Sequence, residues 1–208
     1  MRRICGALAL GLAVVIGAPA HASDPARLGA KFQAPINDGP IDAKLFDEAV
    51  TAHANAARRA HGLPPLKRDG KLLRAAAGHA HNMAQLQTHS HRLPVKGEAR
   101  LAQRMDRNGV RFRTAGENIG MEKVLQLLGR PIAMKAQGCA FSYADDGAPV
   151  PTHTYASLAE SAVARWMASP KHRASLLSKA FRRIGNGVAI DPKGRACGDV
   201  YLVQNFAD

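Results

Sequence analysis

Gly116-Glu117-Asn118-Ile119 is the stretch of this 208-residue chain that best indicates its fold. The segment is typical of a short strand over residues 116–120, and it places a carboxylate beside an amide. Ser90-His91 lies upstream of it, and Trp166-Met167-Ala168-Ser169-Pro170-Lys171-His172-Arg173 lies downstream. Because a glutamate and two histidines stand in three such distinctive settings, we expect Glu117, His91 and His172 to form one site within a single domain.

The first 22 residues have the features of a secretory signal peptide. Arg2 and Arg3 form a basic start, residues 7–16 form an apolar run, and Ala20-His21-Ala22 has the small–x–small pattern of a cleavage site. The apolar run is shorter than the roughly 20 residues that span a bilayer. We therefore expect an exported mature chain, periplasmic or extracellular, that has no membrane span.

The composition favours a basic, solvated surface. The formal net charge is +13 at pH 7, while aromatic residues make up only 5% of the chain. The basic residues are scattered, as in Arg58-Arg59 and Arg182-Arg183, whereas a nucleic-acid groove interleaves basic and aromatic side chains. We therefore expect no specific nucleic-acid binding, and an anionic envelope or lipid ligand is the partner that this charge favours.

Cys139 and Cys197 are the two cysteines that remain once the signal peptide, with its Cys5, is removed. An even pair in an exported chain favours a disulfide. The bridge would pin the loop expected over residues 129–154, which is rich in Gly, Pro and Asp. A redox-active pair is disfavoured because the sequence contains no Cys-x-x-Cys motif.

The periodicity of apolar residues changes from helical to strand-like along the chain. Residues 23–41 lack apolar periodicity and indicate an extended lead-in, so the domain proper is expected to cover residues 42–208. The predicted helices cover residues 42–60, 69–84, 98–108 and 155–167, and the predicted strands cover residues 116–120, 184–190 and 200–206. Asp69 is a suitable N-cap for the second helix, and Gly109 ends the third. Helices first and strands last predict a layered α+β domain.

Several short fragments, taken in order, resemble the bacterial form of the CAP superfamily, which comprises cysteine-rich secretory proteins, antigen 5 and pathogenesis-related 1 proteins. The fragments are Asn55 and Arg58 with Gly62-Leu63-Pro64-Pro65-Leu66, then Ser90-His91, Gly116-Glu117-Asn118-Ile119, Trp166-Met167 with Ser169-Pro170 and His172-Arg173, Ile184-Gly185 with Gly187, and Gln204-Asn205-Phe206. The resemblance covers residues 45–206. It implies a three-layer α-β-α sandwich with a cleft lined by His91, Glu117 and His172.

One position departs from the eukaryotic members of that superfamily. They carry a second glutamate three residues after the tryptophan, where this chain has Ser169. In some of them the cleft histidines bind zinc, and the missing carboxylate weakens such an assignment here. Glu160, on the same predicted helix as Trp166, is an alternative source of a carboxylate.

Three kinds of role remain open for His91, Glu117 and His172. Ser169-Pro170 predicts a helix start, and His172 in its first turn would favour the neutral imidazole that binds metal. The set would then hold Zn²⁺ with an open position for water, or Glu117 would act as a general base. In the third alternative they form a structural network, in which Asn118 holds the turn beside Glu117.

Other residues near these motifs have simpler interpretations. Trp166 lies on the apolar face of its helix and is expected in the core. His79 and His81 are two residues apart on a helix, so they point in different directions and do not chelate together. His89 is expected to be a peripheral histidine.

The function favoured by the sequence is a non-catalytic binding module for a lipid or cell-envelope ligand. The alternative is a zinc-assisted hydrolase of peptide or phosphoester bonds that uses the same cleft, with Glu117 as the candidate catalytic residue. A third possibility is a structural or adhesive envelope component. The enzyme question stays open, although no His-Glu-x-x-His, Gly-x-Ser-x-Gly or phosphate-loop motif is present.

Overall fold

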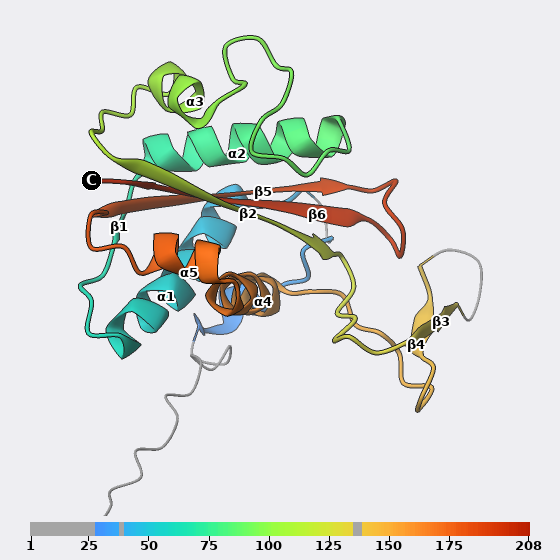
Figure 1. Ribbon diagram of the computed structural model, residues 1–208. Helices are drawn as coiled ribbons and strands as arrows, with labels where there is room; N and C mark the ends of the chain where they lie inside the picture. Colours follow the sequence, from blue (N-terminus) through green and yellow to red (C-terminus); the bar gives the residue numbers. More distant parts are fainter. Residues whose placement is uncertain (1–27, 38–39, 135–138) are drawn as a thin grey trace, which may run out of the picture.

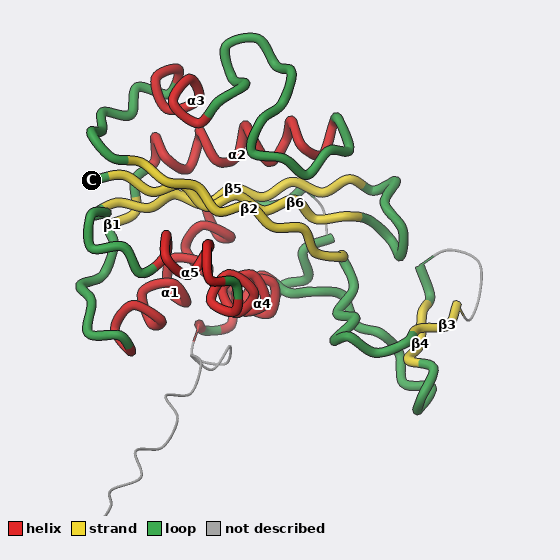
Figure 2. The backbone as a smooth tube through the Cα atoms, in the orientation of Figure 1, coloured by secondary structure: helices red, strands yellow, loops and turns green. Residues whose placement is uncertain are grey.

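A four-stranded sheet separates the helices into two layers (Figure 1). The computed structural model describes residues 28–37, 40–134 and 139–208, so the predicted signal peptide over residues 1–22 lies outside the described residues. Helices α2 (Gly70–Gln85) and α3 (Leu101–Arg107) lie on one side of the sheet, whereas α1 (Ala43–Ala60), α4 (Tyr155–Ala168) and α5 (Pro170–Leu176) lie on the other (Figure 2). The predicted α+β, three-layer α-β-α sandwich is confirmed.

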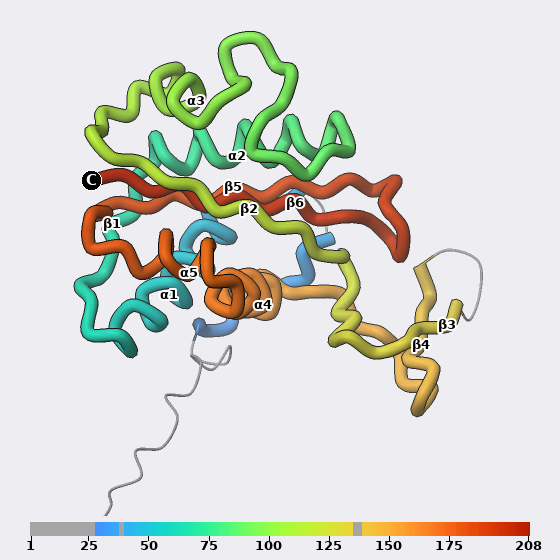
Figure 3. Tube along the Cα trace, viewed as in Figure 1, coloured from blue at the N-terminus to red at the C-terminus, as the bar shows by residue number. Residues whose placement is uncertain are grey.

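The sheet has the strand order β1-β5-β6-β2. Its members are β1 (Lys67–Arg68), β5 (Arg183–Asp191), β6 (Asp199–Ala207) and β2 (Ala115–Lys123). β5 and β2 both pair with β6 in antiparallel register, and β1 pairs in parallel with β5. β2 and β6 are far apart in sequence but lie side by side (Figure 3). The predicted strands are confirmed and are longer than expected, whereas the two-residue β1 was not predicted because it is too short to show a period.

The ends of the helices follow local capping chemistry. The Asp42 carboxylate accepts hydrogen bonds from the first amides of α1, and the Asp69 carboxylate does the same for α2. Helix α3 begins at Leu101 rather than at residue 98, and Gly109, at φ +67°, ends that segment as expected. Ser169 is the N-cap residue of α5, as predicted, but its hydroxyl makes no capping bond within the described part of the chain.

Two segments expected to lack regular structure contain some. The lead-in includes a 3-10 helix, Ala30–Gln33, and Phe32 and Ile36 are buried in the main core. The expected loop over residues 129–154 contains a hairpin of β3 (Ile132–Met134) and β4 (Phe141–Tyr143), which forms an arm at the side of the sandwich (Figure 1). The 3-10 helix and the two strands are each only three or four residues long, so none of them produces a recognisable period.

The predicted disulfide links Cys139 in this arm to Cys197, with 5.4 Å between their Cα atoms. Cys197 lies in the turn between β5 and β6. A small cluster that includes Leu125, Tyr143 and Val150 packs beneath the arm. The arm is therefore attached to the sheet by a covalent bond and by apolar packing.

The core lies on both faces of the sheet. On one face Trp166, Phe46 and Phe206 pack between the sheet and helices α1 and α4, so the prediction that Trp166 is a core residue is confirmed. On the other face α2 packs closely, because a Cβ atom on Gly187 would lie 2.2 Å from the carbonyl carbon of Ala76. None of the described helices is both long enough and apolar enough to cross a membrane.

Candidate functional site

Glu117 is the centre of a buried polar cluster. Its side chain is 3% exposed, yet it belongs to the edge strand β2. Its Oε2 accepts a hydrogen bond from Arg104 Nη2 at 2.7 Å, and its Oε1 accepts one from His91 Nδ1 at 2.8 Å. His79 Nε2 lies 3.9 Å from the same Oε1. Three basic side chains therefore surround one carboxylate.

The surroundings of Glu117 keep it ionised. Burial by itself raises the pKa of its carboxyl group, but the hydrogen bond from His91 and the charge of Arg104 outweigh burial and lower the pKa below its ordinary value. A carboxylate with a lowered pKa is a weak base. Both of its oxygens already accept a hydrogen bond from a side chain. The arrangement therefore favours a positioning role for Glu117 over proton abstraction.

Arg104 joins this cluster to the loop that carries His91. The Arg104 side chain, from α3, is 1% exposed. Its Nη1 donates to the carbonyl of Glu98 at 3.0 Å and to the carbonyl of His91 at 3.4 Å. The His91 side chain is 53% exposed, so Glu117 holds its ring at Nδ1 while the rest of the ring is open to solvent.

His79 is a buried member of the cluster that the sequence interpretation did not place there. Its Nε2 donates to the carbonyl of Ser90 at 3.0 Å, and its side chain is 1% exposed. Burial lowers the pKa of His79 to about 4, so the ring is neutral at pH 7. The sequence did indicate that His79 is buried, because residue 79 lies between Ala76 and Met83 on the apolar face of α2. His79 therefore fixes the backbone of the segment that leads to His91.

Asn118 connects β2 to the opposite layer, because neighbouring side chains of a strand point to opposite faces. Its Nδ2 donates to the carbonyl of His172 at 3.1 Å and to Gln204 Oε1 at 3.2 Å. Asn118 is fully buried. It thus positions α5 from within a strand, whereas the sequence interpretation had it holding a turn beside Glu117. Glu117 fixes His91 on one side of the sheet, and Asn118 fixes the backbone of His172 on the other.

His172 lines a cavity of about 320 Å³ beside the edge of β2. Ser169, His89 and Trp166 also line it. Burial, together with the charge of His91, lowers the pKa of His172 below its ordinary value. His89, expected to be peripheral, therefore lies in the wall of the same cavity as His172, and burial lowers its pKa too.

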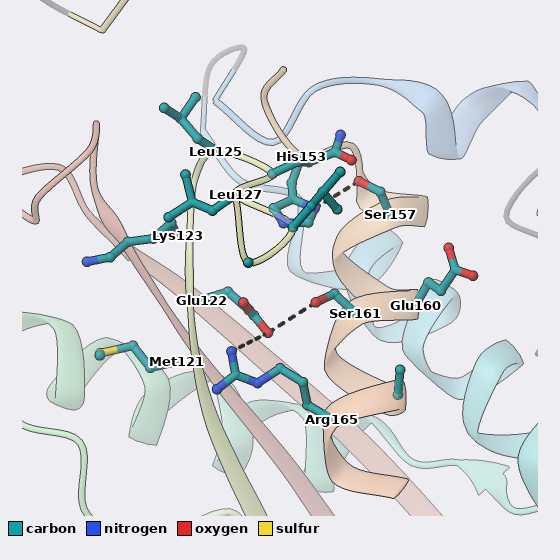
Figure 4. A pocket seen from close by; sticks show the side chains of 14 residues that line it. Met121, Glu122, Lys123, Leu125, Leu127, His153, Ser157, Glu160, Ser161 and Arg165 are labelled. Atoms are coloured by element: carbon teal, nitrogen blue, oxygen red, sulfur yellow. Dashed lines mark hydrogen bonds and ion pairs between the residues drawn. The ribbon is translucent and has the colours of Figure 1, made fainter. Parts of the chain in front are cut away.

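A second cavity, of about 690 Å³, lies farther along the same strand edge and shares Met121 and Arg165 with the first (Figure 4). We call the two together the β2 groove. In it Glu122 pairs with Arg165 at 3.1 Å and accepts a hydrogen bond from Ser161. Glu160 lines this second cavity, not the one with His172, so it does not replace the carboxylate missing at Ser169.

Glu117 does not complete the three-residue zinc ligand set considered with His91 and His172 from the sequence. Glu117 accepts hydrogen bonds from Arg104 and His91 with the oxygens that would bind a metal. Among the residues that the structure describes, no group of three or more His, Cys, Asp or Glu side chains is placed to hold a metal ion. His91 and Glu117 are in direct contact, whereas His172 lines the smaller cavity of the β2 groove, whose lining includes neither of them.

Comparison with known proteins agrees with the fold. An extracellular protein containing an SCP domain from Bacillus anthracis is similar at 24% identity and a TM-score of 0.54, over 82% of this chain and 45% of that one. An outer surface protein from Borrelia burgdorferi is similar at 17% identity and a TM-score of 0.53, over 80% of this chain and 96% of that one. This chain therefore spans less than half of the Bacillus protein. A search of curated proteins found no match.

The family assignment comes from the sequence profile described as "CAP: Cysteine-rich secretory protein family", which matches residues 51–206. The matched region includes the buried cluster around Glu117, both cavities of the β2 groove and the sheet up to residue 206 in β6. The chain therefore belongs to the CAP, or cysteine-rich secretory protein, family.

Proposed function

We propose that this protein is an exported, non-catalytic binding module for a lipid or another cell-envelope ligand, which it takes in the β2 groove. The proposal rests mainly on the hydrogen bonding of Glu117. Arg104 and His91 engage its two oxygens, so the one cleft carboxylate predicted from the sequence is committed to holding the loop of His91. A hydrolase of the kind considered above needs that carboxylate for a metal or a proton.

The shape of the groove supports binding. A cavity of about 690 Å³ lies within the range of roughly 300–1,000 Å³ that is typical of ligand sites. Its walls combine Leu125, Leu127 and Leu128 with a few polar groups. The formal charge of +13 favours attraction to an anionic envelope surface.

A pair of matched variants tests the proposal. Ala164 is exposed on α4 and lines the larger cavity, whereas Ala168 is exposed on the same helix outside the residues that line either cavity. The oxidised mature chain from Ser23 would be extracted with organic solvent for mass spectrometry and titrated with a labelled fatty acid and a labelled sterol. We expect saturable binding of a labelled lipid, unchanged by a chelator, that is lost in Ala164→Trp and kept in Ala168→Trp.

Calorimetry with zinc tests the alternative function on the same protein. We expect no tight one-to-one binding of zinc. Tight binding that is lost in His172→Ala, together with zinc-dependent turnover of a peptide or phosphodiester substrate, would overturn the proposal in favour of a hydrolase.

A further inference from the structure

The free edge of β2 forms the floor of the groove. β2 is the last strand in the order β1-β5-β6-β2, and within the described residues β6 is its one strand partner. Each cavity is lined by three consecutive residues of β2, 119–121 in the smaller and 121–123 in the larger. Side chains alternate between the two faces of a strand, so a cavity lined by consecutive residues faces the backbone edge.

The hydrogen bonds at the two ends of β2 show which backbone groups face that edge. At one end Asp208 N donates to Thr114 O at 3.1 Å, and at the other Val124 N donates to Gly198 O at 3.1 Å. Even-numbered residues of β2, from 116 to 122, therefore direct their N–H and C=O groups toward β6. Because this direction alternates along an antiparallel strand, residues 117, 119 and 121 direct theirs toward the groove.

Most of these outward groups have no hydrogen-bond partner among the described residues. Trp166 Nε1 donates to the carbonyl of Ile119 at 3.0 Å, which confirms that Ile119 faces away from β6. No hydrogen bond from a described residue reaches the N–H of Ile119, or the N–H or C=O of Met121. Met121 is also 37% exposed. A strand edge with free donors and acceptors is a template for another strand.

The opposite wall of the groove matches a short extended chain in length. It is formed by residues of α4 that recur every three or four positions, several of them small: Ser157, Glu160, Ser161, Ala164 and Arg165. From Ser157 to the end of α4 this wall is about 16 Å long at 1.5 Å per residue. About five residues of an extended chain, at roughly 3.4 Å each, match that length.

We propose that the groove binds an extended peptide segment as an added strand on the outer edge of β2. The inference rests on the proposed function and names a polypeptide as an envelope ligand of the same groove, in addition to a lipid. The peptide backbone pairs with the free N–H and C=O of Met121 and with the free N–H of Ile119. The acyl chain of a lipid has no donors or acceptors that could form these hydrogen bonds. One apolar side chain enters the larger cavity against Leu125, Leu127 and Leu128.

Charge indicates the composition of the peptide. Glu122 already bonds Arg165 and Ser161, and the whole chain carries +13. Arg165 keeps 64% of its side chain exposed at the junction of the two cavities. We therefore expect acidic residues on either side of the apolar residue.

The test begins with a library of random seven-residue peptides displayed on phage, selected on the oxidised mature chain. The peptide that is recovered is synthesised, and each backbone nitrogen is methylated in turn. We expect methylation to weaken binding roughly tenfold at alternate positions, those that pair with β2, and to have little effect at the positions between them. Selected peptides that tolerate methylation at every position would overturn the proposal.

Variants of the protein test the same pairing from the other side. Met121→Pro removes an N–H that faces outward, which an edge strand tolerates, whereas Met121→Ala keeps it. We expect Met121→Pro to bind the selected peptide at least about tenfold more weakly than Met121→Ala. If Met121→Pro does not fold by circular dichroism, Ala164→Trp against Ala168→Trp is the comparison. Unchanged peptide binding in Ala164→Trp contradicts the proposal.

The outcomes separate this inference from the proposed function. If no peptide is selected above background and the labelled lipid binds in the groove, the module function stands and the peptide inference is wrong. If neither the peptide library nor the lipids bind, both are wrong.

Discussion

Arg104 Nη2 lies 2.7 Å from Glu117 Oε2, and the two side chains are 1% and 3% exposed. The pair joins α3 to the edge strand β2, and Glu117 also accepts a hydrogen bond from the exposed ring of His91. Breaking a buried ion pair on one side leaves an uncompensated charge in the interior, which is far more destabilising than loss of an exposed pair.

Arg104→Met is therefore expected to lower the free energy of unfolding by about 3–5 kcal/mol, because the Glu117 carboxylate stays buried without its cation. Urea denaturation of the two proteins measures this difference. The control is Arg107→Met on the same helix, since Arg107 pairs with Glu98 at 3.1 Å but is 61% exposed. That variant should lose less than about 1 kcal/mol. Similar losses in both variants would contradict a special role for the buried pair.

The free energy of unfolding should decrease as the pH is lowered from 6.5 to about 4, because of the buried histidines. The pKa of His79 is lowered from 6.5 to about 4 by burial, and that of His153 likewise. In this window the unfolded chain binds protons that the folded chain does not, so the free energy of unfolding decreases as pH falls. The decrease amounts to as much as about 3 kcal/mol for each histidine.

His79→Gln should flatten this pH dependence, measured as urea midpoints between pH 4 and 7. The matched control is His81→Gln, since His81 is exposed on the same helix. A slope that is unchanged in His79→Gln would show that His79 titrates normally. Glu117, whose pKa is lowered, contributes stability above its ordinary pKa and loses it as pH falls through the lowered value.

Gly187→Ala is expected to destabilise the protein by about 3 kcal/mol or more. The added Cβ would lie 2.2 Å from the Ala76 carbonyl carbon and 2.4 Å from its oxygen, so α2 would have to move away from β5. Gly78→Ala is the control, because nothing lies within 4 Å of its Cβ position on α2. It should be stabilising by about 0.5–1 kcal/mol through helix propensity. Thermal melts of both variants measure the difference.

Replacing both Cys139 and Cys197 by serine should lower the free energy of unfolding by about 4 kcal/mol in the chain-entropy model. The bridge spans 58 residues, so it restricts the unfolded chain strongly. Reductant should destabilise the parent protein by the same amount and leave the double variant unchanged. A loss below about 1 kcal/mol would show that the arm around β3 and β4 unfolds independently of the sheet.

The candidate site could be predicted only in part from the sequence. His91, Glu117 and His172 were selected from their local motifs, and the structure brings His91 and Glu117 into direct contact. Arg104 was missed because it is one of 29 basic residues, and nothing near it in sequence distinguishes it from an exposed arginine. His79 was placed correctly on its helix, but its burial beside Glu117 depends on how the segment up to Ser90 folds back.

The sequence by itself determined the helices, the long strands and the layered class of this protein. Those features depend on apolar periods and on caps such as Asp42 and Asp69, whose interactions are with residues close in the chain. Only the tertiary structure decided what Glu117 bonds and which edge of β2 is open. Both depend on long-range packing, since the register with β6 directs the backbone of Met121 outward while α3 brings Arg104 against Glu117.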